Sequence, residues 1–175
     1  SNSWRWIILI LVLQYIGVFL LVALRWPFEL AAAKVVAGWM ASAALGFGIN
    51  EAVATTPSIW QRTEKFSPAG RLFRMLASGL VALTVLSLAP RLVEWVDNIG
   101  TIQVVGALTL IGMGLLHLGL TAQPFRVVIG LLTFLSGFEI LIAAVDISAL
   151  VAGLLAFINL GLGLIGAYLL LDPNM

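Results

Sequence analysis

The segment RVVIGLLTFLSGFEILIAAV, residues 126–145, is twenty residues long, and only Arg126 and Glu139 in it are charged. A helix needs ~20 mostly apolar residues to cross ~30 Å of hydrocarbon. The segment is therefore expected to be a transmembrane helix with Arg126 at one end. Glu139, about thirteen residues further along, lies inside the apolar run.

Similar apolar runs fill most of the chain. They predict six spans at residues 4–26, 27–49, 72–89, 101–121, 125–145 and 147–171. The third span is expected to end at Pro90, because proline has no N–H to donate into a continuing helix. The polar stretch 50–71 is expected to be a loop. The short apolar–polar alternation typical of a membrane barrel is absent, so the sequence predicts an all-α, polytopic membrane protein: one domain, a bundle of about six transmembrane helices.

The composition excludes several classes of protein. The chain is 62% hydrophobic and 10% charged, with a mean hydropathy of +1.13, whereas a soluble domain carries roughly 25% charged residues. Lipid is therefore expected to surround it. The net charge of +1 provides no field for attracting nucleic acid. Without cysteine and with a single histidine, no metal site, cofactor or catalytic residue is expected, and the chain is not expected to be an enzyme.

The basic residues predict an orientation, because Lys and Arg near span ends are retained in the cytoplasm. Six would lie on the side of the termini: Arg5, Arg62, Lys65, Arg71, Arg74 and Arg126. Three would lie on the other side: Arg25, Lys34 and Arg91. This distribution favours a cytoplasmic location for both termini and for the loop 50–71.

Two charged residues inside predicted spans are candidate functional groups, because a charge in hydrocarbon costs about 2.5 kcal/mol or more. Glu139 and Lys34 each lie about seven residues from the outer ends of their spans, ~10 Å deep. They can therefore form an ion pair. Alternatively, Lys34 extends its amine outward along its stem, and Glu139 is a neutral acid hydrogen-bonded to a neighbouring helix. An ion pair or a protonated acid suits a proton relay.

Three further polar residues are candidates for support. His117 lies about four residues from the inner end of its span, level with Gly130, and is not expected to reach Glu139. A lone histidine can ligate haem or a pigment, but a structural hydrogen bond is favoured. Gln14 and Asn159 lie near the middle of their spans, where amides most often form hydrogen bonds between helices.

The fifth span also carries a family resemblance. It begins with Arg126, continues as an apolar run and then contains Gly137, Phe138, Glu139 and Ile140 in succession. In this pattern it resembles the central helix of the K-type membrane subunit of complex I. That subunit's relatives include the E-type subunit of membrane-bound hydrogenases and the C subunit of multisubunit cation/proton antiporters.

The resemblance covers about residues 101–171, the last three spans. It implies that Glu139 belongs to a chain of intramembrane charges along which protons move. It also implies antiporter-like and other membrane subunits as partners in a hetero-oligomeric complex, in a bacterial-type cytoplasmic membrane. One feature departs from the family, whose last helix has a second glutamate. Leu162 stands near that place here, with Asn159 a turn earlier.

The sequence therefore favours a non-catalytic membrane subunit of a proton-translocating or redox complex, with Glu139 and Lys34 as the relay. The alternative is a structural or assembly subunit of a photosynthetic or respiratory supercomplex that packs lipid, quinone or pigment. An autonomous transporter is disfavoured, because no repeat relates residues 1–89 to 101–171.

Overall fold

The computed structural model describes residues 3–55, 68–96, 99–121, 123–145 and 147–171. In this part of the chain all regular structure is helical. The helices are α1 (Ser3–Val22), α2 (Phe28–Thr55), α4 (Pro68–Trp95), α5 (Thr101–Leu120), α6 (Pro124–Val145) and α7 (Ala149–Leu171). These six are long and apolar enough to cross a membrane. For the residues that the structure describes, the prediction of an all-α fold with six such helices is confirmed.

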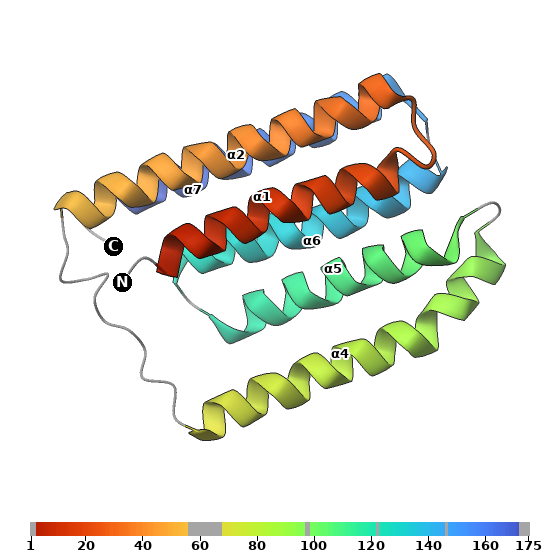
Figure 1. Ribbon diagram of the computed structural model, residues 1–175, viewed down its shortest axis with the longest axis horizontal. Coiled ribbons are helices and arrows are strands. Elements are labelled where there is room, and N and C mark those ends of the chain that lie inside the picture. Colours follow the sequence, from red (N-terminus) through yellow and green to blue (C-terminus); the bar gives the residue numbers. More distant parts are fainter. Residues whose placement is uncertain (1–2, 56–67, 97–98, 122, 146, 172–175) are drawn as a thin grey trace.

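Successive helices run in opposite directions, so α1 begins and α7 ends at the same end of the bundle (Figure 1). Helix α2 lies along α7, while α1 packs against both α2 and α6. On the other side of α6 lies α5, and α4 packs on α5 at the edge of the bundle. Helices α1, α2, α6 and α7 thus surround a common interior, from which α4 is the most distant.

Small residues allow two pairs of helices to approach closely. Between α2 and α7, a Cβ added at Gly163 would lie 2.6 Å from the Cα of Ala41. Between α5 and α6, a Cβ added at Gly114 would lie 2.6 Å from the backbone nitrogen of Phe134. In both places only glycine leaves room for the neighbouring backbone, as is common where apolar helices pack tightly.

Two helix ends differ from the sequence prediction. Helix α2 continues past residue 49 to Thr55. The expected end at Pro90 is wrong, because α4 runs through this proline to Trp95. A proline removes one backbone hydrogen bond and bends a helix without having to end it, and Figure 1 shows the last turns of α4 turning away from its main axis.

The helical ends also shorten the predicted loop 50–71, since residues 50–55 and 68–71 are helical. Arg62 and Lys65, two of the basic residues behind the predicted orientation, lie outside the described residues. The cytoplasmic location of the termini stays a prediction.

The α2–α7 contact predicts the effect of adding one methyl group. Gly163→Ala should lower the melting temperature of the purified protein by several degrees, because overpacking costs ~1–3 kcal/mol. The matched control is Gly161→Ala on the same helix, where a Cβ has nothing within 4 Å and alanine only raises helix propensity. Equal melting temperatures for the two variants would contradict this packing.

Candidate functional site

The side chain of Glu139 points into the interior because of the glycine two residues before it. A Cβ at Gly137 would lie 2.5 Å from the carbonyl oxygen of Ala107, so this face of α6 is pressed against α5. Two residues further along a helix the side chain is rotated by about 200°. Glu139 therefore leaves α6 on the side opposite to α5, and its side chain is 1% exposed.

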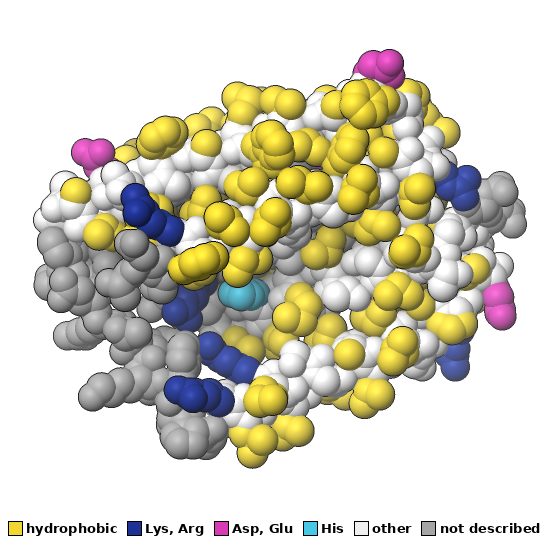
Figure 2. Space-filling view, viewed as in Figure 1, with side chains coloured by type: hydrophobic (Ala, Val, Ile, Leu, Met, Phe, Trp, Pro, Cys, Tyr) yellow, Lys and Arg dark blue, Asp and Glu magenta, His cyan; other side chains and the backbone are white. Residues whose placement is uncertain are grey.

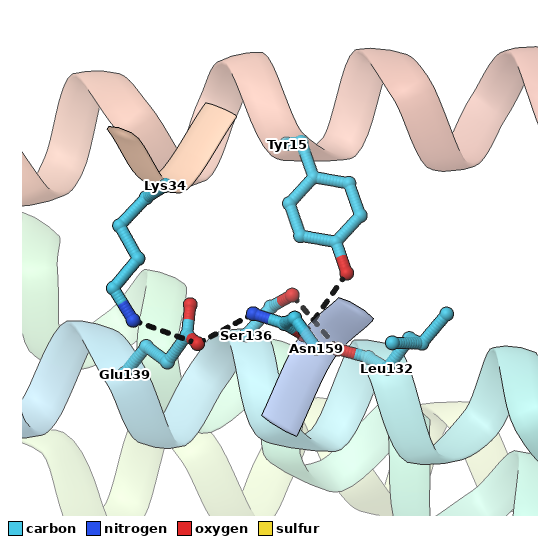
Figure 3. A network of polar contacts seen from close by, with 6 residues as sticks. All are labelled: Tyr15, Lys34, Leu132, Ser136, Glu139 and Asn159. Atoms are coloured by element: carbon cyan, nitrogen blue, oxygen red, sulfur yellow. Dashed lines mark hydrogen bonds and ion pairs between the residues drawn. The ribbon is translucent and has the colours of Figure 1, made fainter. Parts of the chain in front are cut away.

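Four helices each contribute one polar side chain to this place. Lys34 of α2 donates from Nζ to Oε1 of Glu139 at 3.0 Å, and Asn159 of α7 donates from Nδ2 to the same oxygen at 2.6 Å. Tyr15 of α1 donates its hydroxyl to Oδ1 of Asn159 at 3.2 Å. All four residues are buried. Figure 3 shows this arrangement, which we call the polar cluster: Tyr15, Lys34, Glu139 and Asn159.

The possible contact between Lys34 and Glu139 is therefore confirmed as a buried ion pair. The alternative in which Lys34 extends its amine outward is wrong. The Lys34 side chain is 2% exposed, and its Nζ lies 5.9 Å from the centroid of the Trp26 ring. Trp26, itself buried, lies beside the ammonium group, and an aromatic face attracts a cation at this distance.

The second carboxyl oxygen of Glu139 is not used in these hydrogen bonds. Oε2 of Glu139 is buried and has no hydrogen-bond partner among the described residues. A buried acceptor without a donor is costly, and a proton on Oε2 would turn this atom into a donor. The carboxyl group thus has one oxygen held by two donors and a second oxygen able to take a proton.

Apolar clusters enclose the polar cluster on both sides along the helices. Toward the end where α1 begins lie Leu11, Leu45, Ile49, Val128 and Leu132, which form one apolar cluster with Tyr15. Toward the other end lie Val18, Val22, Trp26, Ala31, Ile140 and Ala143. Inside the bundle, the four polar side chains therefore have apolar side chains on both sides along the helix axes.

Tyr15 is the member of the cluster that the sequence analysis missed. Its hydroxyl stands in the middle of an apolar run, next to Gln14, and a buried tyrosine hydroxyl usually needs a partner; that was the available signal. The Tyr15 ring packs against Gly38 on α2, one turn after Lys34. A Cβ at Gly38 would collide with the Tyr15 ring, so glycine lets this ring lie flat against α2.

Asn159 and Gln14 both form the hydrogen bonds between helices that were expected of them. Asn159 joins the polar cluster directly. Gln14 accepts from Oγ1 of Thr133 on α6 at 3.2 Å, while its buried amide nitrogen has no partner among the described residues. Thr133 lies six residues before Glu139, ~9 Å along the helix. Gln14 therefore supports the α1–α6 contact and stays outside the cluster.

His117 and Arg126 lie at another place, near the end where α5 finishes and α6 begins. As expected, His117 stands level with Gly130: a Cβ at Gly130 would lie 3.2 Å from the His117 Cβ. Gly130 lies nine residues from Glu139, ~13 Å along the helix. His117 and Arg126 instead line one pocket with Arg74.

Within the described part of the chain, no three His, Asp or Glu side chains lie close enough together to hold a metal ion. Comparison of the chain with protein-family models, curated proteins and solved structures gave no match. The polar cluster is the feature from which a function can be argued.

Because Lys34 and Glu139 form a buried ion pair, removing one charge alone should destabilise the protein more than removing both. Lys34→Met should destabilise the protein by ~3–5 kcal/mol, because it leaves the Glu139 carboxylate buried without its cation. The double variant Lys34→Met with Glu139→Leu should regain most of that stability, since two apolar side chains of similar size need no partners. Chemical unfolding in detergent measures both. Additive losses in the double variant would contradict the coupling of these two charges.

Proposed function

We propose that this protein is a non-catalytic, multi-pass membrane subunit of a proton-translocating or redox complex, in which Glu139 is a proton-relay carboxylate. The proposal includes a bacterial-type cytoplasmic membrane, with both termini in the cytoplasm. The observation that carries it is the ion pair between Lys34 and Glu139, 3.0 Å long and with both side chains buried. Ionisable groups inside membrane helices commonly mark ion or proton pathways.

The energetics of a buried ion pair support a role beyond packing. Removing two charges from water costs several kcal/mol per ion, and apolar residues of similar volume often stabilise a protein as well or better. The surrounding helices hold this pair with specific groups, since Asn159 donates to the carboxylate and Tyr15 orients Asn159. An arrangement of this kind fixes the geometry of an acid that must remain able to ionise.

The proton step follows from the geometry of the carboxyl group. A proton binds at Oε2, the oxygen without a partner, while Oε1 keeps its bonds from Lys34 and Asn159. Release of this proton restores the ion pair. Because apolar clusters separate the carboxyl from both helix ends, the proton must arrive and leave through water that enters the interior of the bundle.

The resemblance to the K-type subunit of complex I supports the same role and suggests the partners. The matching residues, Arg126, Gly137 and Glu139, place a glutamate inside a central helix. Asn159, a turn before the position of the family's second glutamate, here donates to Glu139. The relay in this chain would therefore consist of one carboxylate with an amide and a lysine, adjacent to an antiporter-like subunit.

Replacing Glu139 tests the proposal in the intact complex. Glu139→Gln keeps the size of the side chain and removes the proton-binding site, so the complex should assemble and lose most of its proton translocation. The measurement is acidification of proteoliposomes that contain the complex extracted in mild detergent. Glu51→Gln, the same change at an exposed position of α2, should leave the rate unchanged. Wild-type translocation by an assembled Glu139→Gln complex would contradict the relay.

A structural role is the second candidate, and the enclosure of the cluster by apolar side chains favours it. In that case the ion pair only fixes how α2 and α6 pack. The variant Lys34→Met with Glu139→Leu separates the two functions, because it removes both charges together. A structural subunit would still support full translocation with this variant, whereas a relay would not.

A further inference from the structure

The ion pair between Lys34 and Glu139 lies closer to one end of the bundle than to the other. Lys34 is six residues into α2 and Glu139 is six residues before the end of α6, so both are ~9 Å from the end where α2 begins. Glu139 is fifteen residues from the start of α6, ~22 Å from the opposite end. On the face that Figure 2 shows, charged side chains lie toward the two ends of the helices, with hydrophobic side chains between them. The shorter route for water to the ion pair therefore starts where α2 begins.

The apolar barrier at this nearer end consists mostly of small side chains. Alanines from three helices contribute to it, beside two valines and an isoleucine: Ala31, Ala143, Ala152, Val18, Val22 and Ile140. The apolar cluster toward the opposite end consists mainly of leucine and isoleucine. Trp26 is the largest side chain of the nearer barrier, and it is 3% exposed. Its ring is therefore the main obstacle on the shorter route.

Trp26 stands outside the helices, in the turn of residues 23–27 that connects α1 to α2. Its backbone is at the end of the bundle, and its ring centroid lies 5.9 Å from Nζ of Lys34. The side chain thus extends from the turn toward the ion pair. Connecting segments move more readily than the helices they join, and a new rotamer of Trp26 breaks no hydrogen bond within α1 or α2. Trp26 can therefore swing away while the helices stay in place.

The position of Lys34 depends on the charge of Glu139. Within the described part of the chain, Lys34 forms one ion pair, with Glu139, and the Trp26 ring is the other group that attracts its ammonium. A proton on Glu139 would leave this ammonium as an unpaired charge in apolar surroundings, which is costly. Asn159 and Tyr15, the other members of the polar cluster, are neutral and cannot replace the carboxylate. A lysine lowers such a cost by extending its stem until the ammonium reaches water, and the nearest water is at the end where α2 begins.

We infer that Trp26 is a gate at this end and that protonation of Glu139 opens it. In the closed state, which the structure shows, the ion pair holds Lys34 inside and the ring lies beside it. With a proton on Oε2, Lys34 moves toward the end where α2 begins and displaces the ring, so that water reaches the carboxyl group. The O–H bond at Oε2 then breaks, the proton forms a new bond to a water molecule, and the carboxylate draws Lys34 back. The inference rests on the proposed relay and names the end at which the relay exchanges protons with water.

Cysteine labelling tests the gate, because the chain has no cysteine of its own. Ala31→Cys places a single thiol in the buried cluster that contains Trp26. The full chain is reconstituted in lipid nanodiscs and treated with a charged, membrane-impermeant thiosulfonate, and mass spectrometry follows the modification. Labelling should be slow, and Trp26→Ala should accelerate it about tenfold, the effect of losing a cation–ring attraction in an apolar site. Trp26→Phe keeps a ring and should keep labelling slow, as should Trp95→Ala, which removes an exposed tryptophan at the same end.

The coupling to protonation is tested by Glu139→Gln, which removes the negative charge at nearly constant size. Although Trp26 is present, this variant should accelerate labelling of Ala31→Cys to a similar extent, because Lys34 has lost its counter-ion. Adding Lys34→Met should restore slow labelling, since no ammonium is left to move outward. A merely structural role of Trp26 would not produce this reversal.

A second reporter distinguishes the gate from general loosening. Ser42→Cys is a change of similar size at a buried position, eight residues beyond Lys34 toward the end where α2 ends, and it should label slowly in every background. Melting temperatures confirm that the variants are folded. The inference is overturned by slow labelling of Ala31→Cys in folded Glu139→Gln, by labelling that stays fast after Lys34→Met is added, or by an equal rise at Ser42→Cys. Labelling requires no proton transfer, so translocation by the Glu139→Gln complex tests the relay separately.

Discussion

The ion pair between Lys34 and Glu139 is the constraint on which the interior of the bundle depends. Neither charge can be left alone in an apolar interior, because an unpaired buried charge costs far more than an exposed one. The pair therefore fixes α2 against α6 at one height, and Asn159 and Tyr15 extend the same constraint to α7 and α1. The polar cluster thus connects four helices whose other contacts are mainly apolar.

Glycines determine where the polar cluster can form. Gly137 lets α6 lie against the backbone of α5 and turns Glu139 to the opposite side. Gly38 gives the Tyr15 ring a place against α2, and Gly163 brings α7 close enough for Asn159 to reach the carboxylate. Larger residues at these positions would separate the helices, and hydrogen bonds of 2.6–3.2 Å cannot survive such separation.

The sequence predicted the helices well because hydropathy alone specifies them. Equal depth of Lys34 and Glu139 in their spans was enough to suggest their contact, since depth follows from counting residues along a helix. The depth of His117 relative to Gly130 followed in the same way. Counting residues does not give the rotation of a helix about its axis or show which helices are neighbours. The place of Tyr15 in the polar cluster and the packing of α2 on α7 were therefore not predicted. The helix through Pro90 was missed because one lost hydrogen bond is a smaller cost than an early helix end in an apolar segment.

The bundle separates two polar places: an enclosed cluster among α1, α2, α6 and α7, and a pocket lined by Arg74, His117 and Arg126 where α5 ends. The central claim concerns the enclosed cluster, that the carboxyl of Glu139 changes its protonation while the complex works. Infrared difference spectroscopy between the resting and the active complex measures this change at the carboxyl C=O band. The account predicts a band that appears in the wild type, shifts in D2O and is missing in Glu139→Gln. Identical carboxyl bands in the wild type and in Glu139→Gln would contradict it.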